Sequence, residues 1–285
     1  MAATAYTHGG NATRATAPRA SAQRAGPLRV CADPNNIPFS NSAGQGFENR
    51  IAELIARDLH RPLEYTWHAQ RRGFIRNTLN AYRCDLVIGI PRHDPMVLTT
   101  IPYYRSTYVF VYRADRGVRV RSFDDPALRH LRIGLHLIGD DYNALPPGIA
   151  LERRGLIRNV VGYSIYGDYA QPNPPARLID AVAKGDVDVA VAWGPLAGYF
   201  AAREPVAMVV VPVSPPMAMP GMPFDFAISL GVRHADTAFA NRLDQLLLRR
   251  RDEIRRILAA YSVPLVESAP RTAATNAALA ARGGG

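Results

Sequence analysis

The residues best suited to binding chemistry follow the first apolar run of the sequence. That run ends at Cys31, where the chain reads CADPNNIPFSN. Asp33, Asn35, Asn36 and Phe39 supply a carboxylate, two amides and an aromatic ring, which can hydrogen-bond to a ligand and stack on it. Asp, Asn and Pro also stiffen ordinary turns. The position after a strand favours a cleft wall, because open α/β folds bind ligands beyond the carboxyl ends of their strands.

Other aromatic residues allow a similar choice of roles. Tyr103, Tyr104 and Arg105 in PYYRS are of types favoured in binding hot spots. They could face a cleft, a protein partner or an interface between two lobes, and the sequence leaves these alternatives open. Trp193 ends the apolar run VDVAVAW, and its place after a strand favours the cleft over the core.

No catalytic or metal-binding constellation can be assembled from the sequence. The Gly-x-Ser-x-Gly, His-Glu-x-x-His, P-loop and Cys-x-x-Cys-His motifs are absent, and GQGFEN lacks the third glycine of a nucleotide loop. Asp140 and Asp141 could hold a metal, but a helix cap with one extra favourable charge is the preferred interpretation. We therefore expect no enzyme activity, no metal site and no cofactor.

The charge of the chain suggests an acidic partner without identifying one. The 285 residues carry a formal net charge of +10, which suits nucleic acid, anionic lipid or an acidic protein. The basic residues are dispersed, with Arg249-Arg250-Arg251 as the only triple, and no nucleic-acid-binding motif accompanies them. No apolar run reaches the roughly 18 to 20 residues of a membrane helix. We expect no nucleic-acid partner and no membrane insertion, and favour an acidic protein.

The two cysteines, Cys31 and Cys84, suit one disulfide in an oxidising compartment, although two buried thiols would give the same count. Each lies at the end of a strand-like run, so neighbouring parallel strands could bring them together. A bridge would close 84 − 31 = 53 residues and contribute about 3 to 4 kcal/mol of stability.

The first half of the chain alternates strands and helices. LRVCA, LEYTW and DLVIGI predict strands, with an amphipathic helix over GFENRIAELIARDL that Pro62 ends, and a second short helix over RRGFIRNTLNAYRC. The continuous apolar run DLVIGI is typical of a parallel strand covered on both faces. A long strand over TYVFVYRADRGVRV then leads out of this doubly wound unit.

A second unit repeats the plan. LRIGL, VVGYSIY and VDVAVAW predict strands, and helices are expected in DDYNALPPGIALERRG and in ARLIDAVAKG, which Gly185 ends. VVVPVSPPMAMPGMP has no periodicity and predicts a connection or rim. Its methionines could form an adaptable partner surface or pack as an ordinary loop. FDFAISLGV predicts a further strand, and the run from Ala235 to Tyr261 predicts one long helix or two.

The pattern predicts a bilobal α/β protein of two doubly wound lobes joined by a hinge. We assign 27–113 plus 213–268 to lobe 1 and 114–212 to lobe 2. The low apolar content of 1–26 and the Ala-rich end at 269–285 predict disordered termini. No intact signal peptide is expected within 1–26, because the hydrophobic central region is missing.

Several longer motifs resemble a known family. GFENRIAELIARDL, LNAYRCDLVIGIP, DAVAKGDVDVAVAWGP and FDFAISLGV follow the order found in periplasmic solute-binding proteins of the amino-acid-binding type (solute-binding protein family 3). More narrowly, RVCADPNNIPFSN, QRRGFIRNTLNAYRCD, YYRSTYVF, IGDD and YGDYAQPNPPARLIDAVAKGDVDVAVAWGPLAGYF resemble the J accessory proteins associated with quinoprotein methanol dehydrogenases. The resemblance spans about Leu28 to Val266.

The resemblance implies a type II periplasmic-binding-protein fold and a periplasmic, non-enzymatic role. The implied partner is a methanol dehydrogenase that depends on pyrroloquinoline quinone (PQQ) and on calcium or a lanthanide, with its cytochrome c as a possible second partner. The motifs add Arg72, Phe74 and Tyr169 to the expected cleft, beside Asp140 and Asp141.

The departures from amino-acid-binding relatives concern the ligand. Those relatives clamp the carboxylate with an arginine about eight residues before the Pro-Tyr pair, where this chain has Asp94. Their ammonium-binding aspartate corresponds to the neighbourhood of Trp193-Gly194. Asp140-Asp141 at a helix start would repel an anion. We expect that amino-acid binding has been lost and that the protein assists the dehydrogenase; the alternative is a transport receptor for a small neutral or aromatic solute.

Overall fold

The computed structural model describes residues 26–137, 145–164 and 171–267. The predicted disordered termini lie outside these ranges except for Gly26, and so do three predicted site residues, Asp140, Asp141 and Tyr169.

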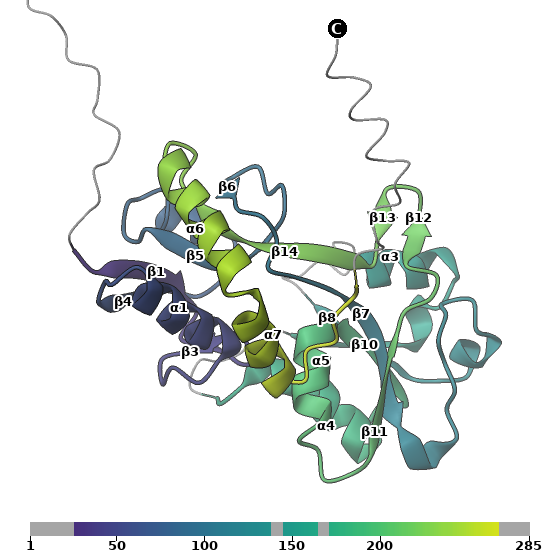
Figure 1. The fold of residues 1–285 in the computed structure, drawn as a ribbon. Helices are drawn as coiled ribbons and strands as arrows, with labels where there is room; N and C mark the ends of the chain where they lie inside the picture. The colour runs from purple at the N-terminus through teal and green to yellow at the C-terminus, as the bar shows by residue number, and fades with distance from the viewer. Residues whose placement is uncertain (1–25, 138–144, 165–170, 268–285) are drawn as a thin grey trace, which may run out of the picture.

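Most strands form one continuous path with the order β4-β1-β5-β14-β7-β10-β8-β9, and β6 and β11 pair with β14 and β7 (Figure 1). Neighbours are parallel in β4-β1-β5 and in β10-β8-β9, while β14 and β7 between them run antiparallel to their neighbours. The strands are β1 (Leu28–Ala32), β4 (Leu63–Trp67), β5 (Leu86–Pro91), β6 (Leu98–Thr99), β7 (Tyr104–Arg113), β8 (Ile133–Leu137), β9 (Val160–Ser164), β10 (Val189–Trp193), β11 (Met208–Pro212) and β14 (Asp225–Val232).

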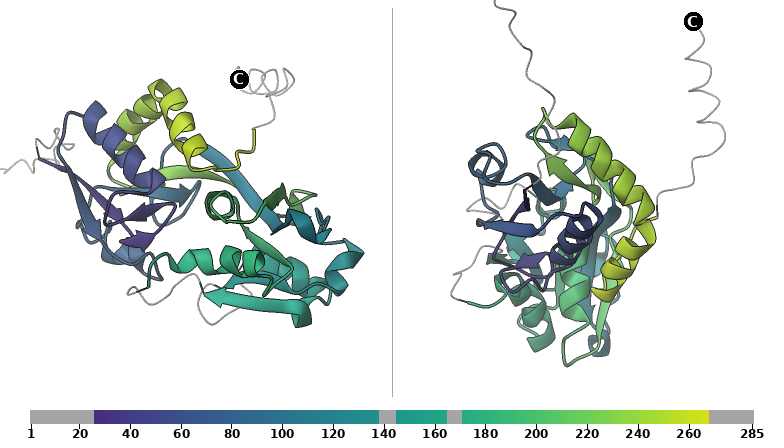
Figure 2. Two further views of the ribbon diagram at one scale, coloured as in Figure 1. Left: turned by 90° about the horizontal axis from the view of Figure 1, so that it is seen from below. Right: turned by 60° about the vertical axis from the view of Figure 1, so that its left-hand side comes forward.

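Strand β7 joins the two halves of this path. Its first four residues, Tyr104 to Thr107, pair with β14, and the rest of the strand pairs with β10 and β11. In Figures 1 and 2 the purple and blue elements from β1 to β5, together with the yellow-green helices from the last part of the chain, form one body. The teal and green elements from β8 to β11 form another. The predicted bilobal fold is therefore confirmed. The lobe boundaries stay a prediction, because β7 contributes to both halves.

The first lobe has a core on each face of its sheet. Leu86 and Ile88 of β5 pack into a cluster with α1 (Phe47–Asp58), α6 (Thr237–Arg249) and α7 (Arg251–Ala260), which cover one face. Val87 points to the opposite face and packs near α2 (Phe74–Asn77). As predicted from its unbroken apolar sequence, β5 is covered on both sides.

The N-terminus of α1 is capped by a side chain of its own first turn. The Asn49 side-chain oxygen accepts a hydrogen bond from the Gly46 backbone N–H at 3.0 Å, which satisfies a donor that the helix leaves free. Ile51, Leu54 and Ile55 then recur on the buried face. This helix start places its first turn beside β5.

In the second lobe, alternate residues of β7 pack into cores on opposite faces of the sheet. Val109 and Val111 face a cluster with α4 (Arg177–Lys184) and α5 (Gly194–Ala201). Phe110 and Tyr112 point to the other side, toward β8 and α3 (Pro146–Arg153). Gly185 ends α4 with φ +83°, as predicted, and short 3-10 helices connect the elements at η1 (Ala114–Arg116), η2 (Pro126–Arg129), η4 (Ile157–Asn159) and η5 (Pro174–Ala176).

Two local predictions were wrong. The second predicted helix is only one turn, α2, because Gly73 enters it at φ +87° and the Thr78 hydroxyl donates to the Phe74 carbonyl at 2.6 Å. The methionine-rich segment forms a hairpin of β12 (Met217–Met219) and β13 (Met222–Pro223) around Pro220-Gly221, a dipeptide suited to a tight turn. A smaller hairpin, β2 (Asn35–Asn36) with β3 (Ser40–Asn41), shapes the first binding loop.

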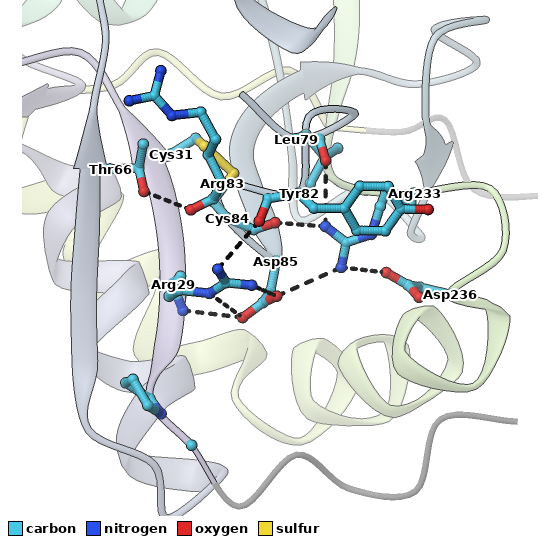
Figure 3. Close-up of polar contacts among 12 residues, drawn as sticks. Arg29, Cys31, Thr66, Leu79, Tyr82, Arg83, Cys84, Asp85, Arg233 and Asp236 are labelled. Atoms are coloured by element: carbon cyan, nitrogen blue, oxygen red, sulfur yellow. Dashed lines mark hydrogen bonds and ion pairs between the residues drawn. A yellow bond between two sulfur atoms is a disulfide. The ribbon is translucent and has the colours of Figure 1, made fainter. Parts of the chain in front are cut away.

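The expected disulfide is present between Cys31 and Cys84, with the two Cα atoms 5.6 Å apart. Figure 3 shows a buried polar network beside it. Arg233 bonds to the Cys84 carbonyl and reaches the carboxylates of Asp85 and Asp236 at 3.5 and 2.7 Å. Asp85 also pairs with an arginine on β1, so this network ties β1, β5 and the approach to α6 together.

Candidate functional site

A cavity of about 480 Å³ lies where the two lobes meet, and elements of both form its wall. It is lined by Asn36, Phe39, Glu48, Gln70, Gly89, Pro91, Tyr104, Tyr108, Leu135, His136, Leu145, Pro146, Val191, Ala192, Trp193, Leu196, Phe226 and Ile228. A cavity of this size matches a small organic ligand or a few side chains of a protein segment.

Three rings from the central strands form an aromatic wall. Tyr108 of β7 lies edge-on to Trp193 of β10, with ring centroids 5.5 Å apart. Phe226 of β14 lies 5.9 Å from Trp193 and 6.5 Å from Tyr108. Because β14, β7 and β10 are adjacent strands, their pairing registers bring these residues together.

Glu48 supplies a carboxyl group to this apolar cavity. It is the second residue of α1 and is only 8% exposed. Burial, together with the nearby charge of Asp33, raises its pKa well above the ordinary value. Among the described residues none donates a hydrogen bond to either carboxyl oxygen. A buried acid without a donor favours its neutral form until a partner arrives.

A bulge in β5 makes room for Glu48. Ile88 and Ile90 pair with consecutive residues of β14, so Gly89 between them is the extra residue. Gly89 has φ +83°, and a Cβ atom there would lie 2.1 Å from the Glu48 Oε1 atom. Glycine is thus required both by the backbone angle and by the close approach of the carboxyl group.

His136 faces the cavity from the second lobe as a neutral side chain. Its Nε2 atom lies 3.2 Å from the Pro175 carbonyl oxygen, so Nε2 carries the hydrogen and donates. Burial lowers the pKa of His136 to about 4. The ring therefore brings no positive charge to the cavity at neutral pH.

Four predicted residues line the cavity together: Asn36, Phe39, Tyr104 and Trp193. They come from the loop after β1, from β7 and from the end of β10. Asn36 and Phe39 follow β1, as predicted, and Trp193 is the last residue of β10.

Asp33 supports the loop, and Asn35 joins the two lobes. The Asp33 carboxylate accepts hydrogen bonds from the backbone N–H groups of Asn35 and Gln70 at 2.8 and 2.7 Å. The Asn35 amide donates to the Gln171 carbonyl at 2.9 Å, and its oxygen accepts from the Asn173 N–H at 3.3 Å. Asn35 is thus a polar bridge between the lobes.

Tyr103 and Arg105 lie on either side of Tyr104 without lining this cavity. The Tyr103 ring packs edge-on against Tyr104 at 5.0 Å. Arg105 pairs with Asp225 at 2.5 Å across β7 and β14. Both residues line a second groove of about 620 Å³, beside α6, α7 and residues 265–267.

Two further predicted residues lie apart from the cavity wall. Phe74 is buried in the cluster beside the Cys31–Cys84 disulfide, where it packs as a core residue, and Arg72 is exposed. Asp140, Asp141 and Tyr169 lie outside the described residues.

Sequence reasoning missed Glu48, Tyr108, His136 and Phe226. An acid in the first turn of a helix is an ordinary electrostatic preference, so Glu48 gave no special signal. The strand residues Tyr108 and Phe226 carry only an alternating pattern, which does not distinguish a cavity from a core.

The cavity lacks the clamp expected of an amino-acid site. No arginine or lysine occurs among the described residues that line it. Asp94, at the position of the relatives' arginine, lies in the turn after β5 and accepts a hydrogen bond from the Met96 N–H at 2.8 Å. The described residues also contain no group of three side chains that could hold a metal ion, and none of their helices is long and apolar enough to cross a bilayer.

Comparison with known proteins decides the family. No family model matches the chain. The protein MoxJ of Methylorubrum extorquens is 34% identical over 265 residues, which cover 89% of this chain and 87% of MoxJ. The chain belongs to the MoxJ family. A second MoxJ, from Paracoccus denitrificans, is 28% identical over 85% of the chain and 90% of its own length.

Solved structures agree with the MoxJ family. The periplasmic binding protein XoxJ from Methylobacterium extorquens AM1 is 36% identical with a TM-score of 0.70, over 85% of this chain and all of XoxJ. MxaJ from Methlophaga aminisulfidivorans MPT is 26% identical with a TM-score of 0.74, over 84% of this chain and all of MxaJ. The bilobal fold of this MoxJ-family chain is therefore that of a periplasmic binding protein.

Proposed function

We propose that this chain is a periplasmic, non-enzymatic accessory protein that binds a PQQ-dependent methanol dehydrogenase and helps to activate or mature it. Its likeness to the MoxJ family over nearly the whole described chain supports the class of function. The observation that carries the proposal is the interlobe cavity, whose described wall has aromatic rings and no arginine or lysine to clamp an amino-acid carboxylate.

The proposed mechanism is a shift in the population of partner states. The cavity holds a segment of the metal-free or PQQ-free dehydrogenase and so favours a conformation that accepts the cofactor. Loading then stabilises the mature enzyme, whose segment leaves the cavity. The Asn35 bridge between the lobes must open to admit such a segment, because it lies between β2 and the segment before η5.

The methionine-rich hairpin β12–β13 is a second candidate contact for the dehydrogenase or its cytochrome c. Met217 is 46% exposed, and methionine side chains adapt to irregular surfaces. The net charge of +10 would speed association with an acidic partner at low salt.

A transport receptor for a small neutral or aromatic solute is the alternative function. The size of the cavity and its three-ring wall favour a small ligand as much as a segment. In that case the lobes would deliver the solute to a permease, and the dehydrogenase would be irrelevant.

Reconstitution of the dehydrogenase separates these functions. Purified apo-dehydrogenase would be incubated with PQQ and with calcium or a lanthanide, with and without this protein at equimolar concentration. The proposal predicts faster recovery of activity and higher metal content when the protein is present. Identical recovery and metal content in both samples, for calcium and lanthanide enzymes alike, would exclude the accessory role.

A further inference from the structure

The interlobe cavity contains an acid that the proposed function does not explain. The Glu48 carboxyl group faces the cavity, is 8% exposed and receives no hydrogen bond from the described residues. Burying such a group without a partner costs stability. The fold nevertheless provides a glycine bulge at Gly89 that admits it, which indicates a binding role rather than a packing role.

Aromatic rings surround the space in front of this acid. Five of them line the cavity, from Phe39, Tyr104, Tyr108, Trp193 and Phe226. The face of an aromatic ring carries negative potential and attracts a cation, most strongly when water is excluded. The aromatic rings and the ionised acid therefore both favour a positively charged ligand.

The remaining lining residues disfavour an anion. The described wall has no arginine or lysine, and His136 is neutral because its Nε2–H is donated to a carbonyl. Among the described residues, a carboxylate or phosphate ligand would meet Glu48 and five aromatic side chains without a positive partner.

We propose that the cavity binds an alkylammonium group on an apolar stem, with Glu48 as its counter-ion and the aromatic rings around the stem. This deepens the proposed function and rests on it for the role of the cavity. The group could come from a free small amine or from a lysine side chain of the partner segment, since both present the same chemistry.

Binding would be linked to proton release. The ligand keeps its ammonium proton, while Glu48 loses its carboxyl proton to solvent and becomes the counter-ion. Affinity for the ammonium should rise with pH until Glu48 is ionised in the free protein. Other titratable groups among the described residues near Glu48 are Asp33, Tyr65, Tyr103 and Tyr104. Tyr108 and His136 also line the cavity. Burial and the charge of Glu48 raise the pKa of both Tyr103 and Tyr104 well above 10, so both stay neutral at the two pH values of the test below.

The test is calorimetric titration of the full chain with matched ligands at pH 6 and pH 8. Butylammonium represents the free amine, and an apolar pentapeptide with blocked ends and one central lysine represents the partner segment. Butanol and butyrate are the neutral and anionic controls. We expect binding of at least one ammonium ligand, tighter at pH 8 than at pH 6, and binding at least tenfold weaker for butanol and butyrate.

Two variants test the assigned groups. Glu48→Gln keeps the shape and removes the charge, so ammonium affinity should fall at least tenfold and lose its pH dependence. Glu53→Gln, on the exposed face of the same helix, is the matched control and should bind like the unmodified protein. Phe226→Leu keeps an apolar side chain and should weaken ammonium binding about fivefold. Melting curves show whether each variant is folded.

Equal binding of butanol and butylammonium, or unchanged ammonium affinity in folded Glu48→Gln, would overturn the inference. So would the absence of binding by both ammonium ligands. Failure of the two proposals can be told apart. A protein that binds the dehydrogenase but no ammonium contradicts only the inference, whereas one that binds butylammonium but has no effect on the dehydrogenase contradicts only the accessory role.

Discussion

Glu48 and Gly89 depend on each other at the edge of the cavity. The carboxyl group of Glu48 occupies the space that a side chain at position 89 would need. The Gly89 backbone also has a positive φ that disfavours other residues. The buried position of Glu48 therefore depends on the bulge in β5.

We predict that Gly89→Ala lowers the free energy of unfolding by about 2 to 4 kcal/mol, because backbone strain and the clash with Glu48 add. Gly44→Ala is the matched control, since Gly44 also has a positive φ but a Cβ atom there meets nothing within 4 Å. The control should lose about 1 kcal/mol. Chemical denaturation measures the free energy of unfolding of both variants. Equal losses of stability in the two variants would contradict the predicted clash with Glu48.

The buried acid also predicts a pH-dependent stability. Burial raises the pKa of folded Glu48 well above 4.5, its ordinary value. Folding therefore takes up a proton at pH values between the ordinary pKa of Glu48 and its raised pKa, and the contribution of Glu48 to stability falls as the pH rises above about 4.5. Glu48→Gln does not titrate, so its melting temperature relative to wild type should increase from pH 4 to pH 8. A difference that is constant with pH would contradict a raised pKa.

Individual site residues could be predicted only where their position in the sequence indicates a place in the fold, such as the end of a strand. Asn36 and Phe39 follow β1, and Trp193 ends β10, so all three lie at strand ends, where the cavity is. Glu48 could not be found in this way, because its role depends on a bulge in a different strand. Phe74 was assigned from motif resemblance, which does not distinguish a ring in the cavity from a ring packed beside the disulfide.

At the scale of elements, the Cys31–Cys84 disulfide joins two strands that pair side by side. Val30 and Cys31 of β1 pair with Leu86 and Val87 of β5, close to Cys84. The parallel arrangement expected from the two apolar runs is what brings the sulfur atoms together. Arg233, whose guanidinium lies 4.8 Å from the Tyr82 ring, covers the same region.

We predict that the double variant Cys31→Ser/Cys84→Ser loses about 3 to 4 kcal/mol of unfolding free energy, because its unfolded chain is no longer constrained by a 53-residue loop. Denaturation with urea measures the loss, and wild type treated with reductant should behave like the double variant. A loss below about 1 kcal/mol would show that the bridge does not stabilise this lobe.

Most elements could be predicted from periodicity, and the exceptions have local causes. The apolar runs of β5 and β10 and the spacing in α1 are long and regular, so pattern alone identified them. α2 is cut short by a backbone angle at Gly73 and a Thr78 side-chain bond, neither of which periodicity reports. The β12–β13 hairpin depends on the turn dipeptide Pro220-Gly221. It was not predicted, because the apolar residues around this dipeptide show no regular spacing.

At the scale of the whole molecule, the binding-protein plan places the candidate site where the lobes meet. β7 and β14 pass between the lobes and carry Tyr108 and Phe226 of the aromatic wall. Any change in lobe angle would therefore alter the cavity directly. The overall plan could be predicted because two similar units with a returning strand have few ways to pack. The chemical class of the ligand could not be predicted, because it depends on how the side chains are arranged around the cavity.

We propose that the interlobe cavity binds the dehydrogenase instead of an amino acid. Calorimetric titration of the protein with matched apo and cofactor-loaded dehydrogenase tests it most directly. We predict binding that is tighter for the apo form and that is weakened by Trp193→Ala, a change in the cavity wall. Equal affinity for both forms, or no binding to either at micromolar concentrations, would show that the cavity does not select the apo-dehydrogenase.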